Sequence, residues 1–162
     1  MCGIAGFITA PASAIELKTI TKKMVDMIVH RGPDDSGIWV DENCQIALGH
    51  QRLSILDLSS AGHQPMHSAC DRFVMVFNGE IYNHLEIRDK LQTTNHQLLD
   101  WQGHSDTETL LAAIVNWGIE KTLNACVGMF SIVLFDRQEN VLTLVRDRMG
   151  EKPLYYGWQG NT

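Results

Sequence analysis

Short apolar runs, rich in β-branched and aromatic residues, constrain the fold of this chain more than any other feature. They occur in consecutive groups, separated by hairpin signals such as Asn78-Gly79 and Gln138-Glu139-Asn140. Strands that follow one another without a helix between each pair favour antiparallel sheets with packed helices. We therefore predict an α+β fold with strands at residues 4–8, 46–48, 53–56, 73–77, 130–135 and 141–145.

Two segments have the pattern of helices. A helix is predicted at residues 107–117, where Ser105, with Glu108 three residues later, has the form of a capping box before the apolar stretch at 110–115. Another segment repeats apolar residues at spacings of three and four, which places them on one helical face. These residues are Leu17, Ile20, Met24, Met27 and Ile28.

Charge and hydropathy exclude two classes of partner. The net charge of −6 is spread along the chain, and no cluster of lysine and arginine offers a surface for nucleic acid. No apolar run approaches the roughly 18 residues of a membrane span, and the N-terminus lacks the basic region of a secretory signal. We expect a cytoplasmic protein with a single domain over residues 1–162.

Neither the cysteines nor the histidines predict a metal site. His63 and His67 bracket Pro65, which argues against a helix that presents both imidazoles together. The cysteines lie far apart without a C-x-x-C pair, so we expect free thiols and no bound metal. They are Cys2, Cys44, Cys70 and Cys126.

Cys2 follows the initiator methionine directly. Removal of Met1 would give one residue both a thiol and a free α-amine, whose reference pKa of about 7.7 to 8.0 lets it accept the thiol proton near neutral pH. Nucleophile and base would then be the same residue, with no catalytic histidine. Taken alone, the position favours the simpler role of a small buried side chain.

Eight motifs are spread along nearly the whole chain. In order they are residues 1–7 (MCGIAGF), 30–34 (HRGPD), 50–56 (HQRLSIL), 62–66 (GHQPM), 77–83 (FNGEIYN), 105–109 (SDTET), 128–131 (GMFS) and 146–156 (RDRMGEKPLYY). Together and in this order they resemble the glutaminase half of a glutamine-hydrolysing asparagine synthetase. The resemblance implies the class II glutamine amidotransferase fold. This is an N-terminal-nucleophile architecture, a four-layer αββα sandwich with two antiparallel sheets.

The resemblance assigns the substrate α-carboxylate to Arg52, whose guanidinium presents two parallel donors to two oxygens. The alternative is an ordinary surface arginine on a strand. The four residues after Arg52 are expected to contribute backbone contacts to glutamine. They are Leu53, Ser54, Ile55 and Leu56.

Asn78 and Gly79 match an oxyanion hole, in which a side-chain amide and a backbone N–H point at the oxygen that becomes negative. The local alternative is a type I′ hairpin turn, and glycine would permit a backbone conformation that serves both roles. Glu80, in the same motif, is expected to meet the backbone groups of the substrate.

Asp106 matches the carboxylate that pairs with the α-ammonium of glutamine. It also lies where the first turn of a helix is expected, so compensation of the helix dipole is a sufficient structural explanation. Arg31 and Asp34 resemble members of the loop that frames the site.

The implied reaction uses Cys2 to attack the side-chain amide of L-glutamine, releases ammonia and leaves a γ-glutamyl thioester for water to hydrolyse. This domain would need no cofactor. In the family, ammonia passes to a synthetase domain or subunit that uses ATP and magnesium, and the sequence contains no Ser-Gly-Gly-x-Asp loop of that domain. A second copy of the chain, forming a homodimer, is a further partner that we consider.

The chain ends earlier than the glutaminase half of its family, so we expect its C-terminal end and the synthetase domain to be missing. A fragment, a truncated reading frame and a small glutaminase serving a separate subunit all stay open, as does the acceptor. Competing functions are the glutaminase half of another class II amidotransferase and a non-catalytic or misfolded fragment that acts at most as a scaffold. The loops at residues 31–35 and 62–66 disfavour the other amidotransferases.

Overall fold

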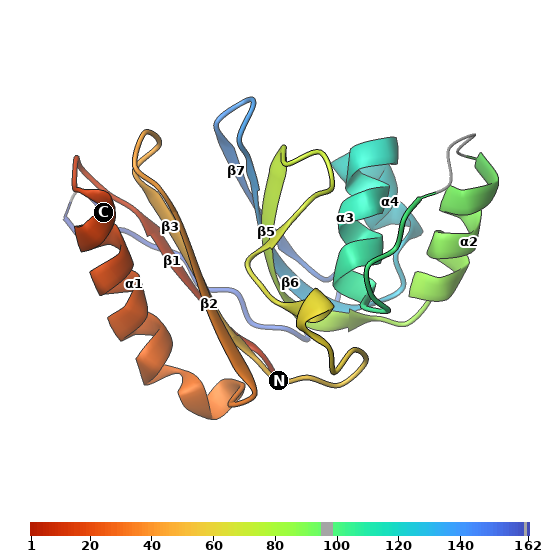
Figure 1. Cartoon of the computed structure of the whole chain (residues 1–162), viewed down its shortest axis with the longest axis horizontal. Coiled ribbons are helices and arrows are strands. Elements are labelled where there is room, and N and C mark those ends of the chain that lie inside the picture. Colours follow the sequence, from red (N-terminus) through yellow and green to blue (C-terminus); the bar gives the residue numbers. More distant parts are fainter. Residues whose placement is uncertain (95–98, 161) are drawn as a thin grey trace.

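The computed structural model describes residues 1–94, 99–160 and 162. In this part of the chain, two antiparallel sheets pack face to face between helical layers, so the α+β sandwich predicted above is confirmed (Figure 1). One helix covers the outer face of the first sheet, and the remaining described helices cover the outer face of the second.

The first sheet has the strand order β1-β3-β2. It contains β1 (Gly3–Ile8), β2 (Asp35–Asp41) and β3 (Ile46–Arg52), and α1 (Ala14–Met27) covers its outer face. The helix approaches β3 closely at Gly49, where an added Cβ would lie 2.3 Å from Val25 Cγ2. Antiparallel pairing of β1 with β3 brings the N-terminus beside the end of β3.

The second sheet has its strands in chain order, β4-β5-β6-β7. They are β4 (Met66–His67), β5 (Phe73–Ile81), β6 (Gly128–Asp136) and β7 (Val141–Arg146). The helices on its outer face are α2 (His84–Thr94), α3 (Asp106–Trp117) and α4 (Ile119–Ala125), and single 3-10 turns occur at η1 (Val29–Arg31) and η2 (Ser60–Gly62).

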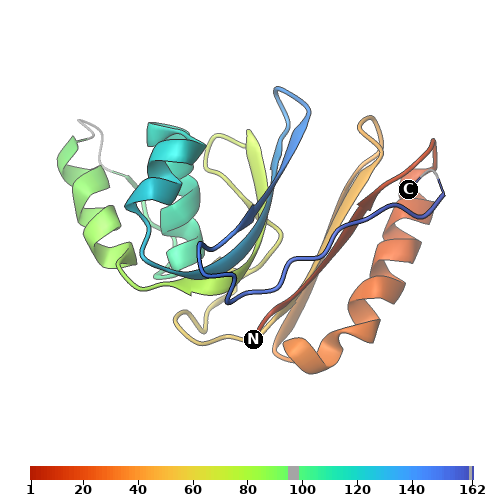
Figure 2. The same ribbon diagram turned by 180° about the vertical axis from the view of Figure 1, so that it is seen from behind.

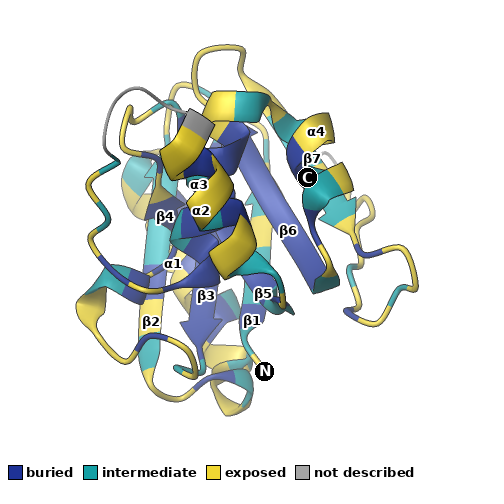
Figure 3. Cartoon of the chain, turned by 90° about the vertical axis from the view of Figure 1, so that its right-hand side faces the viewer, coloured by how far each residue is buried: buried dark blue, intermediate teal, exposed yellow. Residues whose placement is uncertain are grey.

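Alternation along β5 and β6 divides the core into two parts. One set of side chains faces the first sheet, and the other set faces the helices, where it packs with apolar residues of α2, α3 and α4. In Figure 3 strands β5 and β6 of the second sheet are largely buried, whereas the helices expose one face. The buried residues between the sheets are Ile46, Leu48, Val74, Val76, Val133 and Phe135.

The expected strand at residues 53–56 is wrong, because β3 ends at Arg52 and the chain continues as an irregular loop. Its apolar residues do not enter the core, since Ile55 is 69% and Leu56 is 44% exposed. The sequence analysis also missed β2, β4, α2 and α4. Strand β2 contains a glycine and two aspartates, which are depleted in strands.

Both predicted helices are confirmed, with differences in detail. In α1 the buried residues are Leu17, Thr21 and Val25, whereas Ile20 and Met27 of the expected apolar face are exposed. The residues of α1 that contact the first sheet are therefore spaced by four, at positions 17, 21 and 25.

The cap of α3 is half of the expected capping box. Ser105 Oγ accepts from the Glu108 N–H at 3.2 Å. The Glu108 carboxylate does not return to the Ser105 N–H but accepts from the N–H groups of Gln102 and Gly103. The start of α3, which carries Asp106, is thus tied to the segment that precedes it.

After β7 the chain crosses from the second sheet to the first and runs past β1 (Figure 2). Leu154 packs against the core between the sheets, and Thr162 Oγ1 lies 3.2 Å from Thr9 Oγ1 at the far end. The aromatic side chains of Tyr155 and Trp158 face solvent along this path.

Candidate active site

Pairing of β1 with β3 positions Cys2. Gly3 lies opposite Gln51, so Cys2, one residue earlier, lies beside the end of β3. The Leu53 N–H points at Cys2 Sγ at 3.4 Å, and the thiol lies 3.7 Å from the Leu53 carbonyl oxygen. The thiol is therefore held by the first residue of the loop that follows β3.

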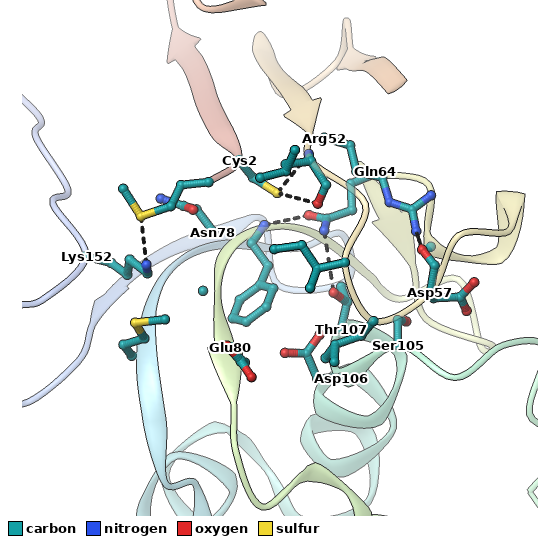
Figure 4. Close-up of a pocket in the computed structure, with 18 residues that line it drawn as sticks. Cys2, Arg52, Asp57, Gln64, Asn78, Glu80, Ser105, Asp106, Thr107 and Lys152 are labelled. Atoms are coloured by element: carbon teal, nitrogen blue, oxygen red, sulfur yellow. Dashed lines mark hydrogen bonds between the residues drawn. The ribbon is translucent and has the colours of Figure 1, made fainter. Parts of the chain in front are cut away.

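A cavity of about 100 Å³ opens beside this thiol. Figure 4 shows Cys2 and Asp106 at different ends of it. Ser54 is absent from the lining, because its N–H turns outward to bind Asp34 Oδ2 at 2.8 Å. The other residues singled out for glutamine all line the cavity: Cys2, Arg52, Leu53, Ile55, Leu56, Asn78, Gly79, Glu80 and Asp106.

The backbone of β5 presents a free donor to the cavity at Gly79. On the edge of β5 that faces away from β6, the Phe77 N–H binds Gln64 Oε1 at 2.7 Å and the Ile81 N–H binds Asp106 Oδ2 at 2.9 Å. Backbone N–H groups point to the same edge at every second residue, so the Gly79 N–H points there too. No hydrogen bond among the described residues uses it.

Asn78-Gly79 is not a hairpin turn, which corrects the local interpretation. Both residues lie inside β5 and pair with Ser131 and Phe130 of β6. Glycine is required by the close approach of β6, since an added Cβ would lie 2.3 Å from the Met129 carbonyl oxygen. A positive φ is not the reason.

Gly79→Ala should therefore destabilise the fold. The new methyl group must displace the backbone of β6, and overpacking of this kind costs about 1–3 kcal/mol. We expect Tm to fall by about 3–10 °C in thermal unfolding. Gly157→Ala is the matched control, because nothing lies within 4 Å of its added Cβ. Equal Tm values for the two variants would contradict this account.

Asn78 is buried, at 5% exposure, and lines the cavity. Its backbone carbonyl accepts from Ser131 Oγ at 3.4 Å. In the described part of the chain, no hydrogen bond involves its side-chain amide. The amide is therefore available to a ligand beside the Gly79 N–H.

Asp106 brings a buried carboxylate to the cavity, at 5% exposure. Burial raises its pKa above the ordinary value. The Ile81 N–H, the charge of His84 and the Thr107 N–H oppose the rise, and the nearby Glu80 adds to it. Among the residues that the structure describes, no ion pair neutralises it. A ligand cation placed here would be attracted by both carboxylates.

Arg52 is buried at the end of β3, and its guanidinium donates to the backbone carbonyls of Asp57 and Ser59 (Figure 4). Its side chain therefore holds the loop at residues 53–59. Gly62 packs directly against this guanidinium. Arginine has five N–H donors, so these two bonds leave capacity for a carboxylate.

Asp57 links that loop to the start of α3, a role that sequence reasoning missed. Its carboxylate accepts from Ser59 Oγ at 2.6 Å and from the His104 N–H at 2.8 Å. These bonds, with Arg52 nearby, lower the pKa of Asp57 to about 2. Asp57 thus links Arg52, which donates to its backbone carbonyl, to the segment before α3, whose His104 N–H donates to its carboxylate.

Arg31 and Asp34, which were expected to belong to the loop around the site, lie in different places relative to the cavity. Asp34 holds the Ser54 N–H, and its own N–H donates to the Arg52 carbonyl at 3.0 Å. Arg31 packs beside Gly3, next to the nucleophile, and does not line the cavity.

Lys152 also lines the cavity without having been predicted. It is 4% exposed, and its Nζ lies 2.9 Å from Met1 Sδ. Lys152 and Gln64 both belong to motifs named above, but only the folded chain, with its strand pairings, places them at the site. Sequence spacing alone carried no signal for either.

The remaining His, Cys, Asp and Glu side chains of the described residues do not cluster as metal ligands would. The described residues contain no group of three or more His, Cys, Asp or Glu side chains that could hold a metal ion. His63 pairs with Asp35 at 2.7 Å and His67 with Asp71 at 2.6 Å. All four cysteines are free thiols, and none of the described helices has the length and apolar character of a membrane span.

Comparison with known proteins gives a consistent picture. A family model described as a glutamine amidotransferase domain matches residues 1–162. The glutamine-hydrolyzing asparagine synthetase 3 of Bacillus subtilis is 34% identical to this chain, and the match covers 100% of the chain and 26% of the relative. The asparagine synthetase 1 of the same organism is 38% identical, and the match covers 96% of the chain and 24% of the relative. A Zea mays asparagine synthetase is 36% identical over 98% of the chain and 25% of its own length.

A solved structure shares the fold. The glutamine phosphoribosylpyrophosphate amidotransferase from B. subtilis superposes with a TM-score of 0.71 at 21% identity, covering 99% of this chain and 40% of that one. The chain spans about a quarter of the length of the Bacillus and maize relatives.

Proposed function

The chain belongs to the glutamine amidotransferase domain family, and on this basis we propose that it is the glutaminase part of a glutamine-hydrolysing asparagine synthetase. One observation carries the proposal. The Cys2 thiol, the free N–H of Gly79 and the unneutralised carboxylate of Asp106 meet in one cavity.

Cys2 is the proposed nucleophile. Once Met1 is removed, its α-amine accepts the thiol proton, and the sulfur attacks the side-chain carbonyl carbon of L-glutamine. The protonated α-amine gives this proton to the amide nitrogen, the C–N bond breaks, ammonia leaves, and a γ-glutamyl thioester remains. Water hydrolyses the thioester to glutamate and restores the thiol.

The oxyanion formed during attack would lie between the Asn78 amide and the Gly79 N–H. Both are donors without a protein partner among the described residues, and both belong to a strand held rigidly in a sheet. Donors fixed before the reaction lower the barrier because they need no reorganisation as charge develops.

The α-ammonium of glutamine is assigned to Asp106, with Glu80 beside it, and the α-carboxylate to Arg52. Leu53, Ile55 and Leu56 border the substrate, whereas Ser54 supports the loop from behind. Pairing a buried, unneutralised carboxylate with an ammonium removes the cost of its isolated charge. The pocket would thereby select free amino acids over glutamine inside a peptide.

Beyond this chemistry, we propose that residues 1–162 form a domain that supplies ammonia to a synthetase domain or subunit. The glutaminase step needs no cofactor, and ATP and magnesium would act in the synthetase on an acceptor carboxylate. A cytoplasmic location and a homodimer belong to the same proposal. The names of the Bacillus and maize relatives support asparagine as the product of the complete enzyme.

The proposal is tested by incubating the Met1-free chain with L-glutamine and measuring glutamate and ammonia. We expect equal amounts of both, and no release from a peptide-bound glutamine. A folded chain with a free N-terminal cysteine that released neither would refute the proposed function.

Asp106→Asn should weaken glutamine binding while stabilising the free protein. Loss of a charged partner costs about 1.5–3 kcal/mol, so KM should rise about 10- to 100-fold. Because the folded pKa of Asp106 is raised, the ionised form destabilises the fold as pH rises above the ordinary value of 3.8. The variant should therefore have a higher Tm at about pH 7 and no advantage at about pH 3, where wild-type Asp106 is protonated.

Steady-state hydrolysis of glutamine gives KM, and thermal unfolding at both pH values gives the change in Tm. Asp100→Asn is the control, because Asp100 is exposed. An unchanged KM together with an unchanged Tm would show that Asp106 neither binds the ammonium nor carries a buried charge.

A further inference from the structure

We propose that Gln64 is a positioning residue for the oxyanion hole, tying the strand that carries Asn78 and Gly79 to the start of the helix that carries Asp106. The inference rests on the proposed function and adds to it a residue that touches neither substrate nor nucleophile in that mechanism. Gln64 is 4% exposed, and its side-chain amide bridges two elements of the cavity wall (Figure 4).

The register of the second sheet explains the first contact. Strand β4 begins at Met66 and pairs with β5 at Met66 opposite Met75 and at His67 opposite Val74. Extended back by two residues from Met66, this register places Gln64 opposite Phe77. There the Gln64 side chain replaces a backbone partner, because its Oε1 accepts from the Phe77 N–H at 2.7 Å.

The second contact reaches the helix. Gln64 Nε2 lies 3.5 Å from Thr107 Oγ1, and Thr107 directly follows Asp106. One buried amide therefore accepts from β5 and donates towards the first turn of α3. The oxyanion donors and the proposed ammonium acceptor share this connection.

His50 contacts the carbonyl group of Phe77. Its Nε2 lies 3.1 Å from the Phe77 carbonyl oxygen, and its buried Nδ1 has no partner among the described residues. A carbonyl can only accept, so the imidazole carries its proton on Nε2. Burial lowers the pKa of His50 to about 4, consistent with a neutral ring. Gln64 and His50 together satisfy both backbone groups of Phe77.

Phe77 matters because Gly79 lies two residues further along the same edge. A rotation of β5 at Phe77 would turn the Gly79 N–H away from the oxyanion. An oxyanion hole tolerates little displacement, because its donors must lie about 2.7–3.1 Å from the developing charge. Loss of the Gln64 contact should therefore slow the step that forms the oxyanion more than it weakens binding.

Gln64→Met and Gln64→Glu test the inference, with Gln138→Met as the matched control on the exposed turn after β6. Methionine removes both contacts, whereas glutamate keeps an acceptor for the Phe77 N–H and loses the donor to Thr107. For Gln64→Met we expect kcat for glutamine hydrolysis to fall about 10- to 100-fold and KM to stay within about threefold. Gln64→Glu should lose less, and Gln138→Met nothing.

Alkylation of Cys2 by iodoacetamide separates positioning from general disruption. The thiolate displaces iodide from a saturated carbon, so no oxyanion forms and the rate should be unchanged in both Gln64 variants. A parallel loss of alkylation and hydrolysis in both variants would overturn the inference. So would an unchanged kcat.

Hydrogen exchange of the Phe77 amide gives a readout that does not depend on glutaminase activity. We expect exchange to be at least about 10-fold faster in Gln64→Met than in wild type, and slower in Gln64→Glu than in Gln64→Met. Unchanged exchange in Gln64→Met would overturn the positioning role even if the chain hydrolysed no glutamine. Absence of hydrolysis in the wild type would instead refute the proposed function.

Discussion

Cys2→Ala should lower kcat for glutamine hydrolysis by about 10⁴-fold or more. Without the thiol there is no atom to form the γ-glutamyl thioester, and none of the other cysteines lines the cavity. Substrate binding should survive, because the groups assigned to the α-carboxylate and α-ammonium are untouched. The measurement is steady-state release of glutamate, with glutamine binding by calorimetry.

Cys70→Ala provides the control, since Cys70 is an exposed thiol that does not line the cavity. It should keep full activity. More than about 1% of wild-type activity in Cys2→Ala would rule out Cys2 as the nucleophile.

Asn78→Ala should reduce kcat by about 10²- to 10³-fold with little change in KM. The side-chain amide faces the cavity, and in the proposed mechanism its N–H group meets an oxygen that becomes negative only during attack. Ground-state binding gains little from such a donor, so the loss should fall on the chemical step.

Asn43→Ala is the control for this variant, because Asn43 lies in the exposed turn between β2 and β3. Asn78→Ala must also keep a wild-type Tm for the interpretation to hold. A large rise in KM with kcat unchanged would assign Asn78 to substrate binding and leave Gly79 as the oxyanion donor.

Strands β5, β6 and β7 were predictable because each contains a short apolar run rich in β-branched and aromatic residues. Residues 73–77 and 130–135 place one set of side chains in the core between the sheets and the other set in the core beneath the helices. Both segments are part of longer strands in the structure. Residues 53–56 have similar composition but lie beyond the paired length of β3, so Ile55 and Leu56 remain at the surface. Composition does not reveal where pairing stops.

Asn78-Gly79 shows how tertiary structure overrides a local turn signal. In isolation the pair favours a hairpin, but β6 supplies a partner for the whole of residues 73–81 and keeps the chain extended. The free donor at Gly79 then follows from strand geometry. No local pattern could have predicted it.

The candidate site residues came from motifs, and their positions came from the fold. Cys2, Arg52, Gly79 and Asp106 lie on different elements, and the sheet pairings bring them to one cavity. Gln64 lay inside one of the motifs without a role, because its contact with Phe77 depends on where β4 begins. Supporting residues of this kind require the register of the strands.

Intact-mass measurement with a diazoketone analogue of glutamine tests the central claim most directly. Purified protein is weighed before and after incubation, beside Cys2→Ala. We predict that Met1 is absent, that the wild type gains the mass of one adduct, and that Cys2→Ala gains none. A folded wild-type chain that retains Met1, or that stays unlabelled, would contradict the assignment of a glutaminase site built on Cys2.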